Sequence, residues 1–368
     1  MGILKNPSCE VKKTPRLLLH ALLGEPVVSA RVRIGEPHAL AATLPGIEHV
    51  EETGTAHLSL GQDFDQKIFF LQRMRFQSAA DVAEKARRIA ERGYLLMGEI
   101  DDNPILWRET YDATGYAEFV GCHAIQTSTE PLAEILRQYN PHVLVFRNEL
   151  RVLPKKRDYS TESGPVTLFF GALNRGADWR EIMPALNEVL RAQGDKVRVC
   201  VLYDRSFFDA LETPHKELLG TEFPYGYAPY EVYTDALHRS DIALLPLRDT
   251  EFNRTKSDLK FIESAGNGAV ALASPTVYAK TLRDGETGFL YTDARSFRQQ
   301  LAILIEKPTL RRRIAEAAYK YVRENRLLSQ SCKSRVAAWR NLLARLPELE
   351  VERRKRMETL LNNALNNK

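Results

Sequence analysis

Apolar runs of strand length alternate with amphipathic helical segments along most of the chain, and this alternation limits its possible folds more than any other feature. In the first half, the apolar runs predict buried strands at 16–23, 67–73, 94–101, 124–129 and 143–148. A helical pattern at 78–93 lies between two of them. Strands that are apolar throughout and alternate with helices indicate a parallel sheet covered on both faces.

The alternation pauses at 154–165, which is polar, charged and aperiodic, and then starts again. Further strands are predicted at 166–173, 196–204, 242–247, 269–275 and 287–293. Helices are predicted at 178–194, 228–240 and 257–268, with Asp178 and Ser257 as N-caps.

A chain of 368 residues is too long for one ordinary core. The fold class predicted is therefore α/β, with two Rossmann-like, doubly wound domains that face a cleft. We place the first domain at 1–157 and the second at 158–330. Helices at 331–368 follow, and we expect them to cross back towards the first domain.

The composition is that of a soluble globular protein, with 44% hydrophobic and 27% charged residues and no apolar window long enough to span a membrane. The cysteines are far apart and the histidines lack metal-ligand spacing, which argues against a disulfide framework or a metal site and fits a reducing cytoplasm. A net charge of +4 is too small to indicate nucleic acid. The basic runs at 311–313 and 353–356 fit solvated helix faces, or contact with the inner face of an anionic membrane.

The segment 257–275, "SDLKFIESAGNGAVALASP", combines a helix start with charged residues on an apolar path. Its helix begins after a strand, so its N-terminus should face the cleft and favour an anion such as a phosphate. Lys256 and Lys260 add positive charge, and Glu263 lies one turn beyond Lys260 and can accept two hydroxyl donors. These positions fit a nucleotide diphosphate, although the charge pattern alone favours an ordinary surface Lys–Glu pair.

Three segments in order carry a resemblance to a known family: 226–247, 256–291 ("KSDLKFIESAGNGAVALASPTVYAKTLRDGETGFLY") and 301–322. Residues 166 to 325 resemble the C-terminal domain of retaining GT-B glycosyltransferases of the family-four-like, group 1 type. The resemblance implies the GT-B architecture and a hexosyltransferase (EC 2.4) that uses a nucleotide-diphosphate sugar as co-substrate. It also implies retention of configuration, no metal and no cofactor.

The resemblance assigns donor-binding roles in the second domain. Glu263 matches the glutamate that binds the ribose hydroxyls, and Lys260 is expected to contact phosphate together with Lys256 and Ser257 at the helix start. Arg175 and Arg180 are the candidates for the donor diphosphate.

Two further donor positions are less regular. Thr255 stands where the family has a first glutamate that touches the donor sugar, and Glu251 is a candidate substitute that the sequence does not place. The base is expected near 224–229, stacked on Tyr225 or Tyr227.

The first domain is expected to hold the acceptor. Glu99, Asp101 and Asp102 follow a predicted strand and could bind acceptor hydroxyls, with Asp101 and Asp102 as the candidate catalytic carboxylates, or form a structural pair or loop cap. Arg33 and Arg73 are the other candidate acceptor-binding residues.

The function predicted is sugar transfer to a glycan, glycoprotein or lipid-linked acceptor in the cytoplasm, without nucleic acid and without metal. The competing interpretation is a non-catalytic GT-B scaffold or sugar-binding subunit, which Thr255 supports, and a sugar-nucleotide epimerase is a third. The sequence does not identify the sugar, the nucleotide or the acceptor, and it leaves association with a second copy of the chain open.

Overall fold

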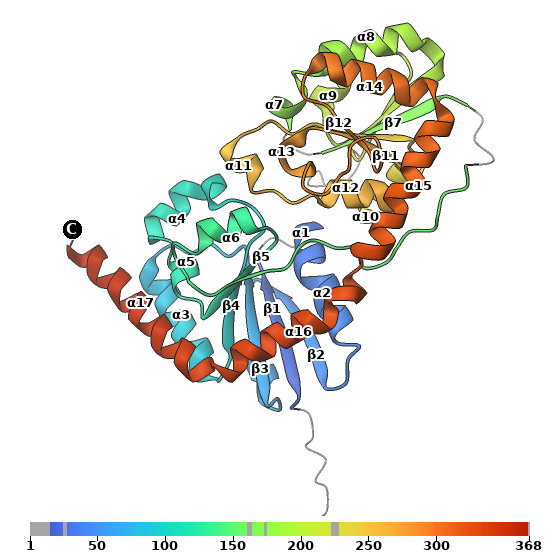
Figure 1. The fold of residues 1–368 in the computed structure, drawn as a ribbon. Helices are drawn as coiled ribbons and strands as arrows, with labels where there is room; N and C mark the ends of the chain where they lie inside the picture. The colour runs from blue at the N-terminus through green and yellow to red at the C-terminus, as the bar shows by residue number, and fades with distance from the viewer. Residues whose placement is uncertain (1–14, 25–27, 160–163, 173–174, 222–227, 367–368) are drawn as a thin grey trace, which may run out of the picture.

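The computed structural model describes residues 15–24, 28–159, 164–172, 175–221 and 228–366, and shows two α/β domains, each built on a parallel sheet (Figure 1). The strand order is β2-β1-β3-β4-β5-β6 in the first sheet and β12-β11-β10-β7-β8-β9 in the second. Both orders reverse direction next to the first strand of the domain, which is the doubly wound pattern. The predicted fold class is confirmed.

The first sheet consists of β1 (Leu17–Leu23), β2 (Ile47–Thr53), β3 (Gln66–Gln72), β4 (Leu95–Glu99), β5 (Ala124–Thr127) and β6 (Val143–Val145). Its central strands are buried on both faces because helices cover each side, whereas the edge strand β2 has one buried residue, Ile47, and is otherwise half-buried or exposed. Strand β2 was not predicted for this reason. The helices are α1 (Val28–Ala30), α2 (Glu36–Ala41), α3 (Ala79–Glu91), α4 (Arg108–Thr114), α5 (Ala117–Val120) and α6 (Glu130–Leu136).

The second sheet consists of β7 (Val166–Gly171), β8 (Val197–Leu202), β9 (Lys216–Leu219), β10 (Ile242–Leu245), β11 (Val270–Ala273) and β12 (Phe289–Leu290). The polar edge strand β9 was not predicted either. The helices are α7 (Gly176–Trp179), α8 (Met183–Gln193), α9 (Arg205–Ala210), α10 (Tyr230–His238), α11 (Glu251–Arg254), α12 (Leu259–Gly266), α13 (Pro275–Tyr278), α14 (Ala294–Glu306) and α15 (Pro308–Asn325).

Both predicted N-caps are wrong. The helix predicted at 178–194 is broken into α7 and α8, so Asp178 lies inside α7, where its carboxylate accepts from the Arg248 backbone N–H at 3.0 Å. The N-cap of α12 is Asp258, whose carboxylate is bound by Arg326 instead of by the helix. Ser257 accepts a hydrogen bond from Asn148 at 2.8 Å.

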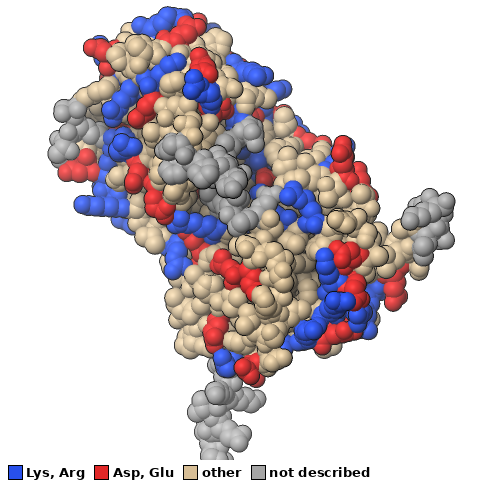
Figure 2. All heavy atoms as spheres, turned by 180° about the vertical axis from the view of Figure 1, so that it is seen from behind, with Lys and Arg blue, Asp and Glu red and all other residues tan. Residues whose placement is uncertain are grey.

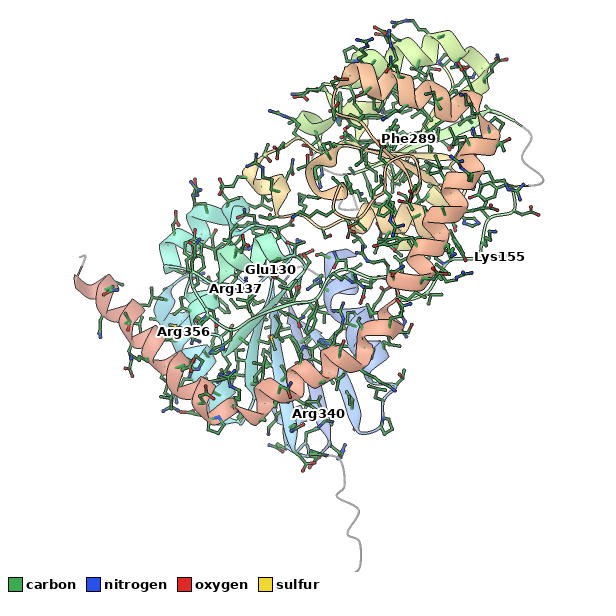
Figure 3. All side chains as sticks on the ribbon, in the orientation of Figure 1. Glu130, Arg137, Lys155, Phe289, Arg340 and Arg356 are labelled. Carbon is green, nitrogen blue, oxygen red and sulfur yellow. The ribbon has the colours of Figure 1, made fainter. Side chains whose placement is uncertain are left out.

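The chain returns to the first domain through α16 (Leu328–Ala344) and α17 (Leu346–Asn366), which lie along it in Figure 1. Trp339 is 1% exposed and packs its ring against those of His38, Phe70 and Phe146. From the same two helices, Arg340 donates to Gln66 and Arg356 donates to the Cys122 carbonyl (Figure 3). The C-terminal helices therefore complete the core of the first domain.

Two backbone segments connect the domains, and they are hydrogen-bonded to each other. The Leu150 N–H donates to the Arg326 carbonyl, and the Leu328 N–H donates to the Leu150 carbonyl, both at 2.9 Å. Arg326 also donates to the Asn148 carbonyl at 2.8 Å. The outgoing and returning chains thus form one paired connection.

The basic runs are only partly the solvated faces that were predicted. Arg311 is buried and donates to the Leu304 carbonyl at the end of α14, and Arg353 is buried and paired with Glu350. Arg354, in contrast, is exposed and also pairs with Glu350. Positive and negative side chains are intermixed on the face shown in Figure 2. Within the described part of the chain, every helix is too short or too polar to cross a membrane.

Replacement of Trp339 tests whether α16 belongs to the first core. Trp339→Ala should lower the free energy of unfolding by about 3–5 kcal/mol, because it removes a large buried ring. Val351→Ala on α17, where the side chain is 68% exposed, should change it by less than about 0.5 kcal/mol. Urea unfolding followed by circular dichroism measures both, and similar small effects would contradict this packing.

Candidate active site

The two domains meet where segments that follow their strands contact each other, since Lys256 after β10 and α11 pairs with Asp102 after β4. Crevices at the carboxyl ends of parallel strands are the usual binding places in doubly wound folds. From the first domain, the segment after β4 brings Asp101 and Asp102. From the second, the segment after α11 brings Lys256, and the start of α12 brings Lys260.

An ion-pair chain joins the domains at this place. Lys256 donates from Nζ to Asp102 Oδ1 at 2.9 Å, and Arg73 donates from Nη2 to both Asp102 and Asp101 at 2.7 Å. Burial would raise the pKa of Asp102, but the charges of Lys256 and Arg73 outweigh that effect and hold the pKa below its usual value. Asp102 is therefore an ionised carboxylate with low basicity.

Backbone and amide hydrogen bonds support the same contact. Thr129 at the start of α6 donates to the Thr255 carbonyl at 2.7 Å, and Asn148 donates to Ser257 at 2.8 Å. The structure thus brings together five of the predicted residues: Arg73, Asp101, Asp102, Lys256 and Ser257. Their catalytic and binding roles stay predictions.

Arg33 and Glu99 do not reach the cleft surface. Their side chains are 2% and 0% exposed and form an ion pair of 2.8 Å. Arg33 also donates to the Phe146 carbonyl and to Asn148. Burial raises the pKa of Glu99 to about 7 against the opposing charge of Arg33. This geometry gives the pair a structural role, tying the segment after α1 to the ends of β4 and β6, and leaves acceptor binding by either residue a prediction.

Cations gather at the carboxyl end of β7. Lys260 donates from Nζ to the carbonyl of Gly171, the last residue of β7. Burial, together with the nearby charges of Arg175 and Lys256, lowers the pKa of Lys260 to about 8. Arg175 is held by Asp178 at 3.0 Å and by Asn253 at 3.3 Å. Arg180 is exposed, with its guanidinium 5.9 Å from the Trp179 ring centre, and the structure does not bring it into this group.

Glu263 lies one helical turn deeper and is only 4% exposed. Its Oε1 accepts from the Tyr230 hydroxyl at 2.9 Å and its Oε2 from the Tyr233 hydroxyl at 2.8 Å. Burial raises the pKa of Glu263, and Lys260 and the two hydroxyls oppose that shift. The interpretation of Lys260 and Glu263 as a surface pair is therefore wrong, because Glu263 is buried and bound by tyrosines.

Comparisons with known proteins find one sequence family and several solved structures that resemble this chain. Residues 198–341 match the family described as glycosyl transferase-like. The match runs from β8 in the second domain to α16 and covers less than half of the chain. A search of curated proteins finds no significant match.

Solved GT-B glycosyltransferases are among the structures that match, and they show that the chain has the GT-B fold. HepE from Anabaena, solved with UDP and glucose, is 14% identical with a TM-score of 0.60, over 89% of this chain and all of that one. Sucrose-phosphate synthase from Thermosynechococcus elongatus is 12% identical with a TM-score of 0.59, over 89% and 99%. TarM from S. aureus, solved with UDP among its ligands, is 12% identical with a TM-score of 0.54, over 78% and 58%. This chain therefore spans little more than half the length of TarM.

In the second domain, the position of Thr255 places no carboxylate in the cleft. It is 4% exposed, and its hydroxyl donates to the Phe252 carbonyl at 2.8 Å. Glu251 is exposed at the start of α11. Tyr225 and Tyr227 lie outside the described residues, so the stacking of a base on them stays a prediction.

Sequence reasoning missed Tyr230, Tyr233 and Asn253. The two tyrosines lie three residues apart in the predicted helix 228–240, a spacing that places them on one face. That spacing was the available signal. Asn253 links Arg175 to Asp178, since its Nδ2 donates to the Asp178 carboxylate at 2.9 Å. Among the residues that the structure describes, no cluster of histidine, cysteine, aspartate and glutamate could hold a metal ion.

Asp102 tests the interdomain ion pairs. Asp102→Asn keeps the shape but removes the charge between Lys256 and Arg73, so the free energy of unfolding should fall by about 1.5–3 kcal/mol. Asp249→Asn is the control, since its ion pair with Arg254 is 62% and 63% exposed, and water screens such a pair so that its loss should have a much smaller effect. Urea unfolding at pH 7 measures both, and equal effects would show that the interdomain pair stabilises no more than a surface pair.

Proposed function

We propose that this protein transfers a sugar from a nucleotide-diphosphate sugar to a hydroxyl group of a glycan, glycoprotein or lipid-linked acceptor. The observation that carries the proposal is the arrangement of Lys260 and Glu263 on α12, a cation at the cleft followed one turn deeper by a buried carboxylate. A diphosphate fits the cation and a ribose diol fits the carboxylate. The UDP bound in the HepE and TarM structures supports a UDP-sugar as the donor.

In the proposed reaction, the bond between the sugar carbon and the diphosphate oxygen breaks while a bond to the acceptor oxygen forms. Negative charge then grows on the diphosphate, and Lys260 and Arg175 stabilise it from fixed positions. Asp102 is paired with cations and has a low pKa, so it is a poor base. We therefore assign the acceptor proton to the leaving phosphate oxygen, on the same face of the sugar, which gives retention of configuration.

The second candidate function is a scaffold that binds a nucleotide sugar but neither hydrolyses it nor transfers its sugar. The side chain of Thr255 donates to its own helix instead of offering a carboxylate to a donor sugar, and this favours the scaffold. Nucleotide binding without hydrolysis or transfer from any nucleotide sugar would support that second function.

Nucleotide binding is the first test. UDP, GDP, ADP and dTDP are added with EDTA, and the one that binds should stabilise the protein by about 2.7 kcal/mol at 100 times its Kd. Glu263→Gln should weaken its binding by about tenfold or more, because bonds from hydroxyls to a charged group contribute about 1.5–3 kcal/mol each. Glu286→Gln, whose carboxylate is 66% exposed, should leave the affinity unchanged. Turnover is measured with the matching nucleotide sugars.

Two results would contradict the proposal. A melting temperature that no nucleotide changes, with or without a divalent cation, excludes the donor site. Full nucleotide affinity in Glu263→Gln would show that the ribose does not bind that carboxylate.

The low pKa of Lys260 predicts a pH dependence of nucleotide binding. The lysine carries its charge below about pH 8, and the diphosphate binds the charged form, so affinity should fall as pH rises from 7 to 9.5. The fall approaches about tenfold per pH unit once the lysine is mostly neutral. Lys260→Arg stays charged over this range and should show a flatter profile. Calorimetric titration at constant ionic strength measures both, and parallel profiles would assign the titration to another group.

A further inference from the structure

Both oxygens of the carboxylate that would bind a ribose already accept a hydrogen bond from a tyrosine hydroxyl. Tyr230 donates to Oε1 at 2.9 Å and Tyr233 to Oε2 at 2.8 Å, so two hydroxyl groups bind one carboxylate, as a ribose diol would. Glu263 is 4% exposed, which leaves little access for a further donor. A ribose can reach Glu263 only where one of these hydroxyls leaves it.

The two tyrosines are held differently. Tyr233 is buried and its ring meets that of Phe169 edge-on at 5.7 Å. Tyr230 is half-buried at the start of α10, where it lines a groove of about 520 Å³ between the domains. The Tyr230 ring contacts the Tyr233 ring at 5.8 Å on one side, but it borders the groove and has space to turn there, whereas Tyr233 is buried within the core. Tyr230 is therefore the displaceable member of the pair.

The first domain holds Tyr230 in place. The guanidinium of Arg31, next to α1, lies 4.2 Å from the centre of the Tyr230 ring. It also donates to Glu231 at 3.3 Å and to Glu36 at 2.9 Å. A cation over a tyrosine ring is an attractive contact, so the position of Tyr230 is linked to the contact between the domains.

We propose that Tyr230 is a gate that occupies the ribose site while no nucleotide is bound, with Arg31 of the first domain holding it closed. Resting on the proposed function, this identifies the residue that a ribonucleotide must displace. The ribose hydroxyls replace the Tyr230 hydroxyl on Glu263 and the ring turns into the groove. The apparent affinity for the nucleotide is therefore lower than the intrinsic affinity by the fraction of molecules with the gate open.

Removing one hydroxyl tests the gate. Tyr230→Phe leaves Glu263 Oε1 without its donor, and a ribose hydroxyl can fill that vacancy without competition. The variant should bind a ribonucleoside diphosphate about threefold to tenfold more tightly than the wild type, the range expected for one hydrogen bond. The affinity for its 2′,3′-dideoxy counterpart should not change, because that ligand has no diol. The probes are UDP, GDP, ADP and the dideoxy form of whichever binds, measured by calorimetric titration.

Matched variants separate the gate from a structural bond. Tyr233→Phe removes a hydroxyl from the same carboxylate within the packed core, so it should lower the melting temperature without tightening binding. Arg31→Gln removes the cation from the Tyr230 ring but keeps the tyrosine, and it should also tighten ribonucleotide binding. Arg205→Gln is its control, since that guanidinium lies 5.8 Å from the Phe208 ring centre on α9.

Three outcomes would overturn the gate. Unchanged or weaker ribonucleotide binding in Tyr230→Phe would show that Tyr230 is a permanent partner of Glu263. If Tyr230→Phe does not fold, unchanged or weaker binding in Arg31→Gln leads to the same conclusion. Equal affinity of the wild type for the ribose and dideoxy forms would show that the diol does not bind Glu263. The nucleotide site of the proposed function would remain. Failure of every nucleotide to bind the wild type and both variants would overturn the proposed function and the gate together.

Discussion

The arrangement of the two domains depends on a carboxylate shared by two cations. Asp102 lies between Arg73 of its own domain and Lys256 of the other, and all three side chains are mostly shielded from water. A charge in such a place is costly unless it is paired, so Lys256 keeps the second domain close to the first. A donor diphosphate at Lys256 and Lys260 would compete with Asp102 for the same cation. The contact that holds the cleft in this arrangement is therefore also one that a substrate can weaken.

The sequence predicts those parts of the fold that depend on local patterns. Continuous apolar runs predicted the inner strands of both sheets, because these strands are covered on both faces. The edge strands β2 and β9 include polar residues and are partly exposed, so they lack a continuous apolar run. The break between α7 and α8 was missed because the pattern from 178 to 194 is helical throughout, although the chain turns at 180–182.

The candidate site was predictable in its positions more than in its partners. Lys260 and Glu263 follow from helical spacing and from the place of α12 after a strand. The bonds that define their chemistry come from distant residues, such as Gly171 for Lys260 and Tyr230 for Glu263. The same holds for Arg33 and Glu99. In the sequence, each one looks like a residue of the cleft, and only the fold shows that they form a buried ion pair with each other. Fold and function also separate here, since the matching structures establish the architecture while the reaction depends on particular side chains.

The paired connection between the domains has a mechanical consequence. A single linking strand would allow one domain to twist and swivel freely relative to the other. Here the outgoing chain at Leu150 and the returning chain at Arg326 and Leu328 are fastened side by side, and α16 and α17 then anchor the returning chain along the first domain. Two connecting segments that are fastened in this way are expected to bend about one axis more easily than they rotate about the others. We therefore expect relative movement of the domains to be mainly a bending at this connection, which would bring the same pairs of side chains back into contact each time the cleft closes.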